Sequence, residues 1–255
     1  MELWTPQHAQ TLLPALAIMI VIAIILRLTI GKKDLKIRMI PFQILACLLF
    51  LIEIGKQIVS FKGGYDLYHI PLHFCSLFLF SIPLMAFYRG KYEAVVRTVT
   101  TVLSGSAMLL MTIYPALIYP AWDVENYFSG YFSFHTVTFH GLVYFAYLLI
   151  LTLQLYGDFG RRECTATLIA ITIFSAVAAT AAQLLKTNFT NMYQCNIPPL
   201  ESVRQMLISS WGYVPAQITY VAGVTAGHIL FLWGVFALSK LLARLADRVF
   251  GGDKA

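Results

Sequence analysis

The sequence predicts an all-α membrane protein with seven transmembrane helices. Hydrophobic residues make up 59% of the 255 residues and charged residues only 12%, which leaves little room for a soluble domain. Each of seven apolar stretches approaches the roughly 20 residues that cross about 30 Å of hydrocarbon. Because a backbone in lipid must satisfy its own hydrogen bonds, these stretches are expected to be helices. They cover Thr11–Ile30, Ile40–Val59, Ile70–Tyr88, Val99–Tyr119, Val137–Tyr156, Ala166–Leu185 and Ile218–Leu242. We expect one membrane domain over residues 1–255.

The basic residues predict the orientation of these helices. Fourteen of the 18 lysines and arginines fall in alternate connections and the C-terminal tail, and only Lys56, Lys62, Lys186 and Arg204 fall on the other side. The positive-inside rule then places the N-terminus outside and the C-terminus in the cytoplasm. The net charge of +6 is therefore attributed to membrane orientation, and no nucleic-acid partner is expected. Membrane lipids are the expected partners, and no soluble partner is indicated.

The start of the chain shows no cleavable signal, because its first ten residues contain Glu2 but no basic cluster. We expect the first helix to remain in the mature protein, in a bacterial cytoplasmic membrane or in a eukaryotic endomembrane. The last outer connection predicts a short amphipathic helix that begins at Pro198-Pro199. Its apolar positions are Leu200, Val203, Leu207 and Trp211.

Polar residues gather toward the outer ends of the predicted helices. Glu53, Lys56 and Gln57 share one helix face. The others are His69, His73, Ser76, His135, His140, Gln183, Lys186, Asn188, Asn191, Gln217 and His228. A single histidine at a helix end is commonly an interfacial hydrogen-bonding group, and Glu53 with Lys56 can be a neutralising pair. Their shared depth nevertheless favours one polar cavity, because titratable groups are costly in hydrocarbon.

The four cysteines form no Cys-x-x-Cys pair, so the sequence suggests neither a thiolate zinc site nor a redox motif. Cys75 and Cys195 are both on the predicted outer side, where they either pair or stay as free thiols. On a helix, Cys75 would point about 160° away from His73.

Two short motifs carry a family resemblance. Pro71–Ser76 reads Pro-Leu-His-Phe-Cys-Ser and resembles the P-L-H-x-C-S motif of the YwaF-like bacterial integral membrane proteins. Asn188-Phe189-x-x-Met192-Tyr193 resembles the Asn/Tyr-rich outer loop of that family. The family in turn resembles the eukaryotic transmembrane-protein-164 group, whose members are described as thiol-dependent acyltransferases on phospholipids.

The resemblance implies a seven-helix fold and an activity on phospholipid acyl chains. The Pro-Cys-His motif of the eukaryotic group would lay its reactive cysteine on Leu72 and its histidine on His73. This chain therefore keeps the histidine but lacks the thiol at that position, and Cys75 is the nearby replacement.

The first hypothesis for function is an enzyme that transfers or hydrolyses acyl chains in the outer leaflet. His73 or His140 would be the general base, Cys75 or Ser76 the nucleophile, and Glu53 would orient the imidazole. The other polar residues, His69, His135, Lys56, Gln57, Gln183, Lys186, Asn188, Asn191, Gln217 and His228, would contact substrate.

Other functions use the same residues. In a metal-dependent variant, His69 and His73 at i and i+4 would hold zinc together with His140 or Glu53, although no metal or cofactor is assigned. A proton-coupled carrier would relay protons through Glu53 and the histidines. The third hypothesis is a non-catalytic interaction protein whose outer pocket binds a lipid, another ligand or a partner helix.

Overall fold

The computed structural model describes residues 3–251, and this part of the chain is helical with no strand. Its long helices are α1 (Pro6–Ile30), α3 (Ile40–Lys62), α5 (Glu93–Ile113), α8 (Tyr131–Thr152), α9 (Arg161–Leu185) and α11 (Tyr213–Phe250). Its shorter helices are α2 (Leu35–Arg38), α4 (Leu77–Phe87), α6 (Pro115–Ile118), α7 (Ala121–Glu125) and α10 (Pro198–Trp211). Two 3-10 turns, η1 (Leu67–His69) and η2 (Phe74–Ser76), precede α4. The prediction of an all-α membrane protein is confirmed.

Six helical segments of the described chain are long and apolar enough to cross a membrane, against the seven that the sequence predicts. The remaining candidate is α4, whose 11 residues extend only about 16 Å at 1.5 Å per residue. The predicted helix over residues 70–88 is therefore wrong in its first turns. Pro71 disfavours helical geometry at the residue before it, and Ile70 is extended, with φ −59° and ψ 132°. His73 is also extended, with φ −78° and ψ 158°.

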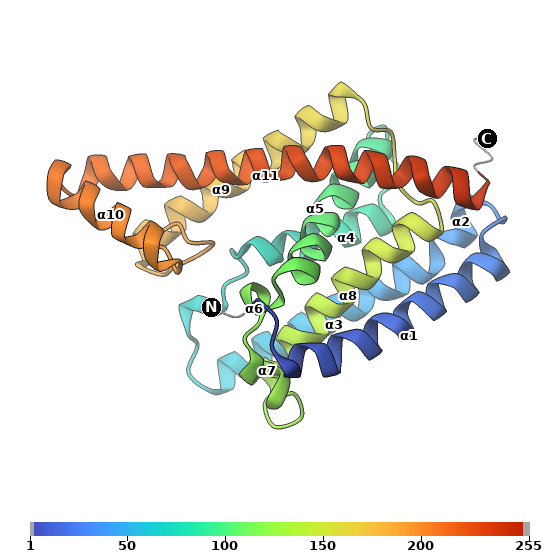
Figure 1. Cartoon of the computed structure of the whole chain (residues 1–255), viewed down its shortest axis with the longest axis horizontal. Helices are drawn as coiled ribbons and strands as arrows, with labels where there is room; N and C mark the ends of the chain where they lie inside the picture. Colours follow the sequence, from blue (N-terminus) through green and yellow to red (C-terminus); the bar gives the residue numbers. More distant parts are fainter. Residues whose placement is uncertain (1–2, 252–255) are drawn as a thin grey trace.

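The bundle is built around α5, which packs against α4, α8, α9 and α11 (Figure 1). Ten residues of α5 are buried, among them the small residues Ser104, Gly105, Ser106 and Ala107. A Cβ atom on Gly105 would lie 2.8 Å from the Tyr147 ring, so the absence of a side chain lets α8 approach. The core of the protein therefore depends on small residues at helix contacts, as is common in membranes.

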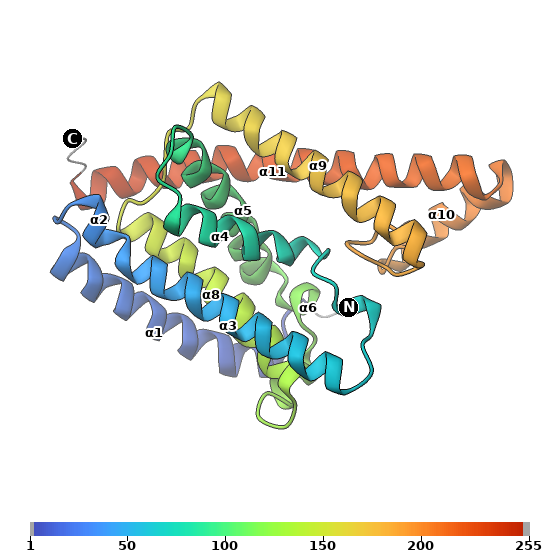
Figure 2. The same cartoon turned by 180° about the vertical axis from the view of Figure 1, so that it is seen from behind.

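The described chain begins at one end of the bundle and finishes at the other (Figures 1 and 2). Near the start of α1, Gln7 donates to Glu125 of α7 at 2.9 Å. At the opposite end of α1, Arg27 donates to the carbonyl oxygen of Phe250, the last residue of α11. We call these the outer and inner ends, after the predicted orientation, which itself stays a prediction.

The predicted amphipathic helix of the last outer connection is confirmed as α10, which begins at Pro198 and packs against α11. At the inner end, a turn at residues 153–160 joins α8 to α9 and passes close to α5. A Cβ atom on Gly157 would lie 2.1 Å from the carbonyl oxygen of Ala94.

We expect Gly157→Ala to destabilise the protein by about 1–3 kcal/mol, because the added methyl group meets backbone that cannot move aside cheaply. Thermal unfolding of the purified full-length protein in detergent measures the effect. Gly234→Ala is the matched control, since a Cβ atom at Gly234 meets nothing within 4 Å. Equal melting temperatures for the two variants would contradict the close approach.

Candidate functional site

A buried carboxylate on α3 is the centre of the polar groups at the outer end. Glu53 Oε2 lies 2.8 Å from His135 Nε2 on α8, and Glu53 Oε1 lies 2.7 Å from the Lys56 ammonium. Gln57 also donates to Oε1, at 2.7 Å. The side chains of Glu53 and His135 are each only 10% exposed. A charged group this buried is tolerated when its partners satisfy it, as three partners do here.

The same network reaches the connection between α3 and α4. Gln57 donates to the carbonyl oxygen of His69 at 2.9 Å and accepts from the Tyr65 hydroxyl at 2.9 Å. His69 Nδ1 lies 2.5 Å from the Ser60 hydroxyl, and its ring stacks on Phe132 with centroids 4.5 Å apart. Five residues that the sequence selects thus meet here. We call Glu53, Lys56, Gln57, His69 and His135 the outer polar cluster.

Among residues 3–251, the motif residue His73 uses one of its two ring nitrogens in a hydrogen bond. Its Nε2–H donates to the carbonyl oxygen of Tyr68 at 2.8 Å, which leaves Nδ1 as the nitrogen with a lone pair. The ring lies against Tyr68 and meets the edge of Phe189. Burial lowers the pKa of His73, and the nearby Lys56 lowers it further, against the opposing effect of the Tyr68 carbonyl. The lowered pKa favours the neutral imidazole, which is the form that can act as a base.

The helical geometry that was expected to separate His73 from Cys75 is absent. The sequence-based angle of about 160° assumes a helix, but His73 is extended and η2 begins only at the next residue. Cys75 is a free, half-buried thiol within η2, whereas Ser76 is buried. His69 lies in η1 and Ser76 in η2, so these two residues do not share one helix face with the extended His73.

The remaining histidines lie outside this network. His140 Nδ1–H donates to the carbonyl oxygen of Thr136 at 2.7 Å, and its ring lies 6.3 Å from that of Tyr119. His228 on α11 lies 3.4 Å from the Ser175 hydroxyl on α9. The structure therefore does not bring His140 or His228 into hydrogen bonds with Glu53.

The selected amides after α9 hold the backbone of the loop at residues 186–197. Gln183 and Gln217 both donate to the carbonyl oxygen of Met192, at 2.9 and 3.0 Å. Asn188 and Asn191 accept from backbone N–H groups within the loop. Lys186 is exposed and ends α9 in the left-handed region, with φ 50°. These contacts fix a loop in which Thr190 and Asn191 also have positive φ.

Sequence reasoning missed an ion pair that supports this loop. Arg204 donates to both carboxylate oxygens of Glu201, at 2.8 and 2.7 Å, and to Gln217 at 2.9 Å. Glu201 also accepts from the backbone N–H of Cys195 at 2.8 Å. The Arg204 guanidinium lowers the pKa of Glu201 to about 2. The i, i+3 spacing of Glu201 and Arg204 on the predicted helix was the available signal.

The low pKa of Glu201 predicts a pH dependence. Its carboxylate stabilises the fold above its ordinary pKa of 4.5, and this stabilisation is lost as the pH falls toward 2. We expect wild type to melt above Glu201→Gln at pH 7 and the difference to shrink between pH 4.5 and 2. Thermal unfolding of the full chain across that range checks this. Glu125→Gln is the matched control, since Glu125 is an exposed carboxylate that takes part in no ion pair within the described residues. A difference that stays constant with pH would contradict the assignment.

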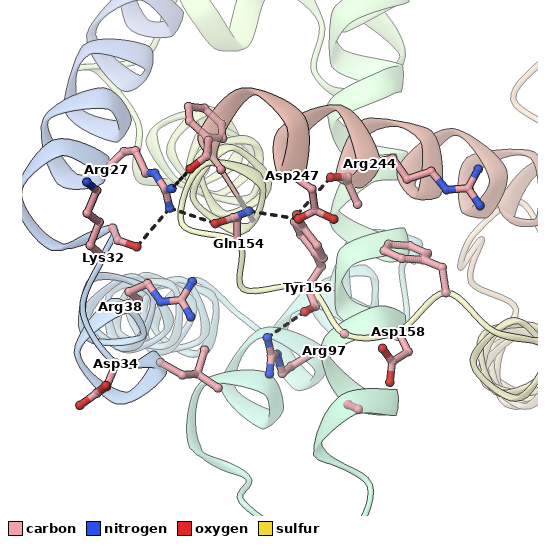
Figure 3. A pocket seen from close by; sticks show the side chains of 18 of the residues that line it. Arg27, Lys32, Asp34, Arg38, Arg97, Gln154, Tyr156, Asp158, Arg244 and Asp247 are labelled. Atoms are coloured by element: carbon pink, nitrogen blue, oxygen red, sulfur yellow. Dashed lines mark hydrogen bonds between the residues drawn. The ribbon is translucent and has the colours of Figure 1, made fainter. Parts of the chain in front are cut away.

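A separate cavity of about 760 Å³ lies at the inner end, away from every residue that the sequence selects for function (Figure 3). From the sequence, the basic residues that line this cavity were interpreted only as signals of how the helices are oriented in the membrane. Gln154 and Tyr156 belong to the turn after α8, which the sequence predicts as helix up to Tyr156 but which leaves the helix after Thr152.

The described residues contain no group of three histidine, cysteine or acidic side chains placed to hold a metal ion. The zinc variant relied on His69 and His73 lying one helical turn apart. That relation is absent, because His69 is in η1 and His73 is extended.

The comparisons with known proteins give one match. The model of the TMEM164 family matches residues 3–238. No curated protein and no solved structure matches the chain.

Proposed function

The chain belongs to the TMEM164 family, and from this premise we propose that it transfers or hydrolyses phospholipid acyl chains at its outer end. It is an integral multi-pass membrane protein, so membrane phospholipids surround it and can reach its outer end. One observation carries the proposal. His73 is extended and precedes η2, which contains the free thiol of Cys75, so the helical geometry that would set the two side chains on opposite faces is absent. The nearer relation to the YwaF-like bacterial proteins, and a bacterial cytoplasmic membrane, stay predictions.

The proposed reaction is thiol-dependent acyl transfer. His73 Nδ1 accepts the thiol proton as Cys75 Sγ attacks the ester carbonyl carbon of a phospholipid. The ester C–O bond breaks, the released lysophospholipid oxygen takes that proton, and the acyl chain stays on Cys75 as a thioester. The hydroxyl of a second lysophospholipid, or water, then attacks the thioester and gives its proton to His73. Cys75 leaves as the thiolate and recovers the proton.

His73 and Cys75 are favoured over the other candidate pair by their surroundings. His140 is 7% exposed and its Nδ1–H is used by the Thr136 carbonyl, whereas His73 is half-buried with Nδ1 free of hydrogen bonds within residues 3–251. Ser76 is 5% exposed and has a far less acidic group than a thiol. Glu53 bonds to His135 and to neither candidate base. We therefore assign the outer polar cluster a positioning role and no direct part in the proton transfer.

A proton-coupled carrier, the alternative function, has less support from the middle of the bundle. The hydroxyls of Ser104 and Ser106 on α5 donate to carbonyl oxygens of their own helix. They are therefore satisfied locally and do not continue the polar cluster toward the inner end.

The test is acyl transfer in vesicles. Purified full-length protein is reconstituted with a phospholipid that carries a labelled acyl chain and with an unlabelled lysophospholipid of another headgroup. We expect the label to move to the second headgroup, or to appear as free fatty acid if water is the acceptor. Absence of both products would overturn the proposal, and flux or lipid-retention assays would then test the carrier and the non-catalytic lipid-binding alternatives.

A further inference from the structure

The lining of the inner-end cavity contains more basic than acidic side chains. It lies where α1, α2, α5 and α11 meet the turn after α8, and its volume of about 760 Å³ is that of a small-ligand pocket. Its basic lining residues are Arg27, Lys32, Lys33, Arg38, Arg97, Lys240 and Arg244. The acidic ones are Asp34, Asp158 and Asp247. The lining therefore carries an excess of positive charge.

This charge is not neutralised by ion pairs within residues 3–251, since none of the cavity's basic side chains takes part in one. Arg97 donates to the carbonyl oxygens of Leu155 and Tyr156, at 2.5 and 2.8 Å. Arg27 donates to Gln154 at 3.1 Å. These neutral acceptors fix the guanidinium groups in place and leave their charge available to an anion.

The half-buried carboxylate of the lining, Asp247, already has hydrogen-bond donors of its own. Asp247 on α11 accepts from the Gln154 amide at 3.0 Å and from the Tyr156 hydroxyl. Figure 3 shows Arg27, Arg38 and Arg97 pointing toward the same space, with Asp34 and Asp158 farther out. The three guanidinium groups come from three different helices, so the fold itself brings them together.

Arg38 is only partly satisfied by the protein around it. Its Nη1 donates to the carbonyl oxygen of Leu153 at 2.9 Å, but its buried Nε–H has no hydrogen-bond partner within residues 3–251. A buried donor without an acceptor is unfavourable, and a charged one more so. An orientation signal alone would be met by any exposed lysine or arginine and would not require such convergence.

We propose that this cavity binds a phosphate group. Phosphate oxygens accept paired hydrogen bonds from guanidinium groups, and a phosphate charge would offset the excess in the lining. The phosphate could be carried by the headgroup of an anionic phospholipid or by a soluble phosphorylated molecule. The two sources share the same chemistry at the arginines, and they differ in whether the rest of the ligand enters from the membrane.

The experiment uses both probes with the full-length protein. The protein is exchanged into detergent micelles that contain phosphatidylglycerol and phosphatidylcholine. Native mass spectrometry then measures how much anionic lipid it retains. Calorimetric titration with inorganic phosphate and glycerol 3-phosphate, in neutral phosphatidylcholine nanodiscs, measures soluble binding. Each is repeated with Arg38→Gln and with Lys36→Gln, which removes one positive charge from the same helix but does not line the cavity.

We expect at least one probe to bind wild type, with affinity about tenfold lower in Arg38→Gln and unchanged in Lys36→Gln. Retention of phosphatidylglycerol alone identifies a lipid headgroup, and binding of the soluble phosphates identifies a soluble ligand. If Arg38→Gln does not fold, Lys240→Gln on the α11 wall takes its place. Absence of binding by every probe, or equal weakening by Lys36→Gln, would overturn the proposal.

Discussion

Cys75→Ser is expected to lower the initial rate of acyl transfer at least about a hundredfold, because a serine hydroxyl is far less acidic than a thiol and less nucleophilic after deprotonation. His73→Ala should lower the rate by a similar factor through loss of the base. If the two residues act in one step, the double variant should be little slower than either single variant. The measurement is the labelled acyl exchange in vesicles, with the reconstituted amount of protein held equal.

Cys47→Ser is the matched control, since Cys47 is an exposed thiol on α3 and should give the wild-type rate. A trapped thioester, detected as an acyl-mass adduct on wild type and absent from Cys75→Ser, would identify the thiol directly. Wild-type transfer by Cys75→Ser would exclude Cys75 as the nucleophile.

The second large effect is on stability. Glu53→Ala is expected to lower the free energy of unfolding by about 3–5 kcal/mol, because Lys56 is left as an unpaired charge in a buried site. His135 also loses its 2.8 Å partner. Reversible unfolding in mixed SDS and dodecylmaltoside micelles measures the change.

Glu125→Ala is the control for loss of a carboxylate at the outer end, since Glu125 is exposed and bonds only to Gln7 within the described residues. We expect it to change the free energy of unfolding by less than about 1 kcal/mol. Glu53→Ala combined with Lys56→Met should recover part of the loss, because the unpaired charge is then removed. No recovery in the double variant would contradict the charge argument.

The apolar periodicity of the sequence predicted the helices well, because lipid leaves a long apolar segment few alternatives. It failed at residues 70–76, where hydropathy alone continued the helix through Pro71 and the extended His73. This is also where the candidate chemistry lies. An apolar composition cannot distinguish a helical turn from an extended segment whose backbone groups are hydrogen-bonded by neighbouring elements. Only the structure shows that His73 and Cys75 need not lie on opposite faces of a helix.

The polar residues were predicted in part. Their common depth identified Glu53, Lys56, Gln57, His69 and His135 as a group, and the structure joins them by hydrogen bonds. Depth could not separate that group from Gln183 and Gln217, which bind loop backbone instead. The inner-end cavity could not be predicted either, because its charge comes from connections whose approach depends on helix packing.

The loop at residues 186–197 gives the outer end a further property. Thr190 donates to the carbonyl oxygen of Leu72 at 3.0 Å, and the edge of Phe189 faces the His73 ring. The same loop is held from its other side by Glu201 and Gln217. A displacement of α10 by the lipids around it would therefore be transmitted to His73. This coupling is reciprocal. If docking of α10 strengthens the binding of a molecule against His73 by some free energy, that molecule stabilises the docked position of α10 by the same free energy.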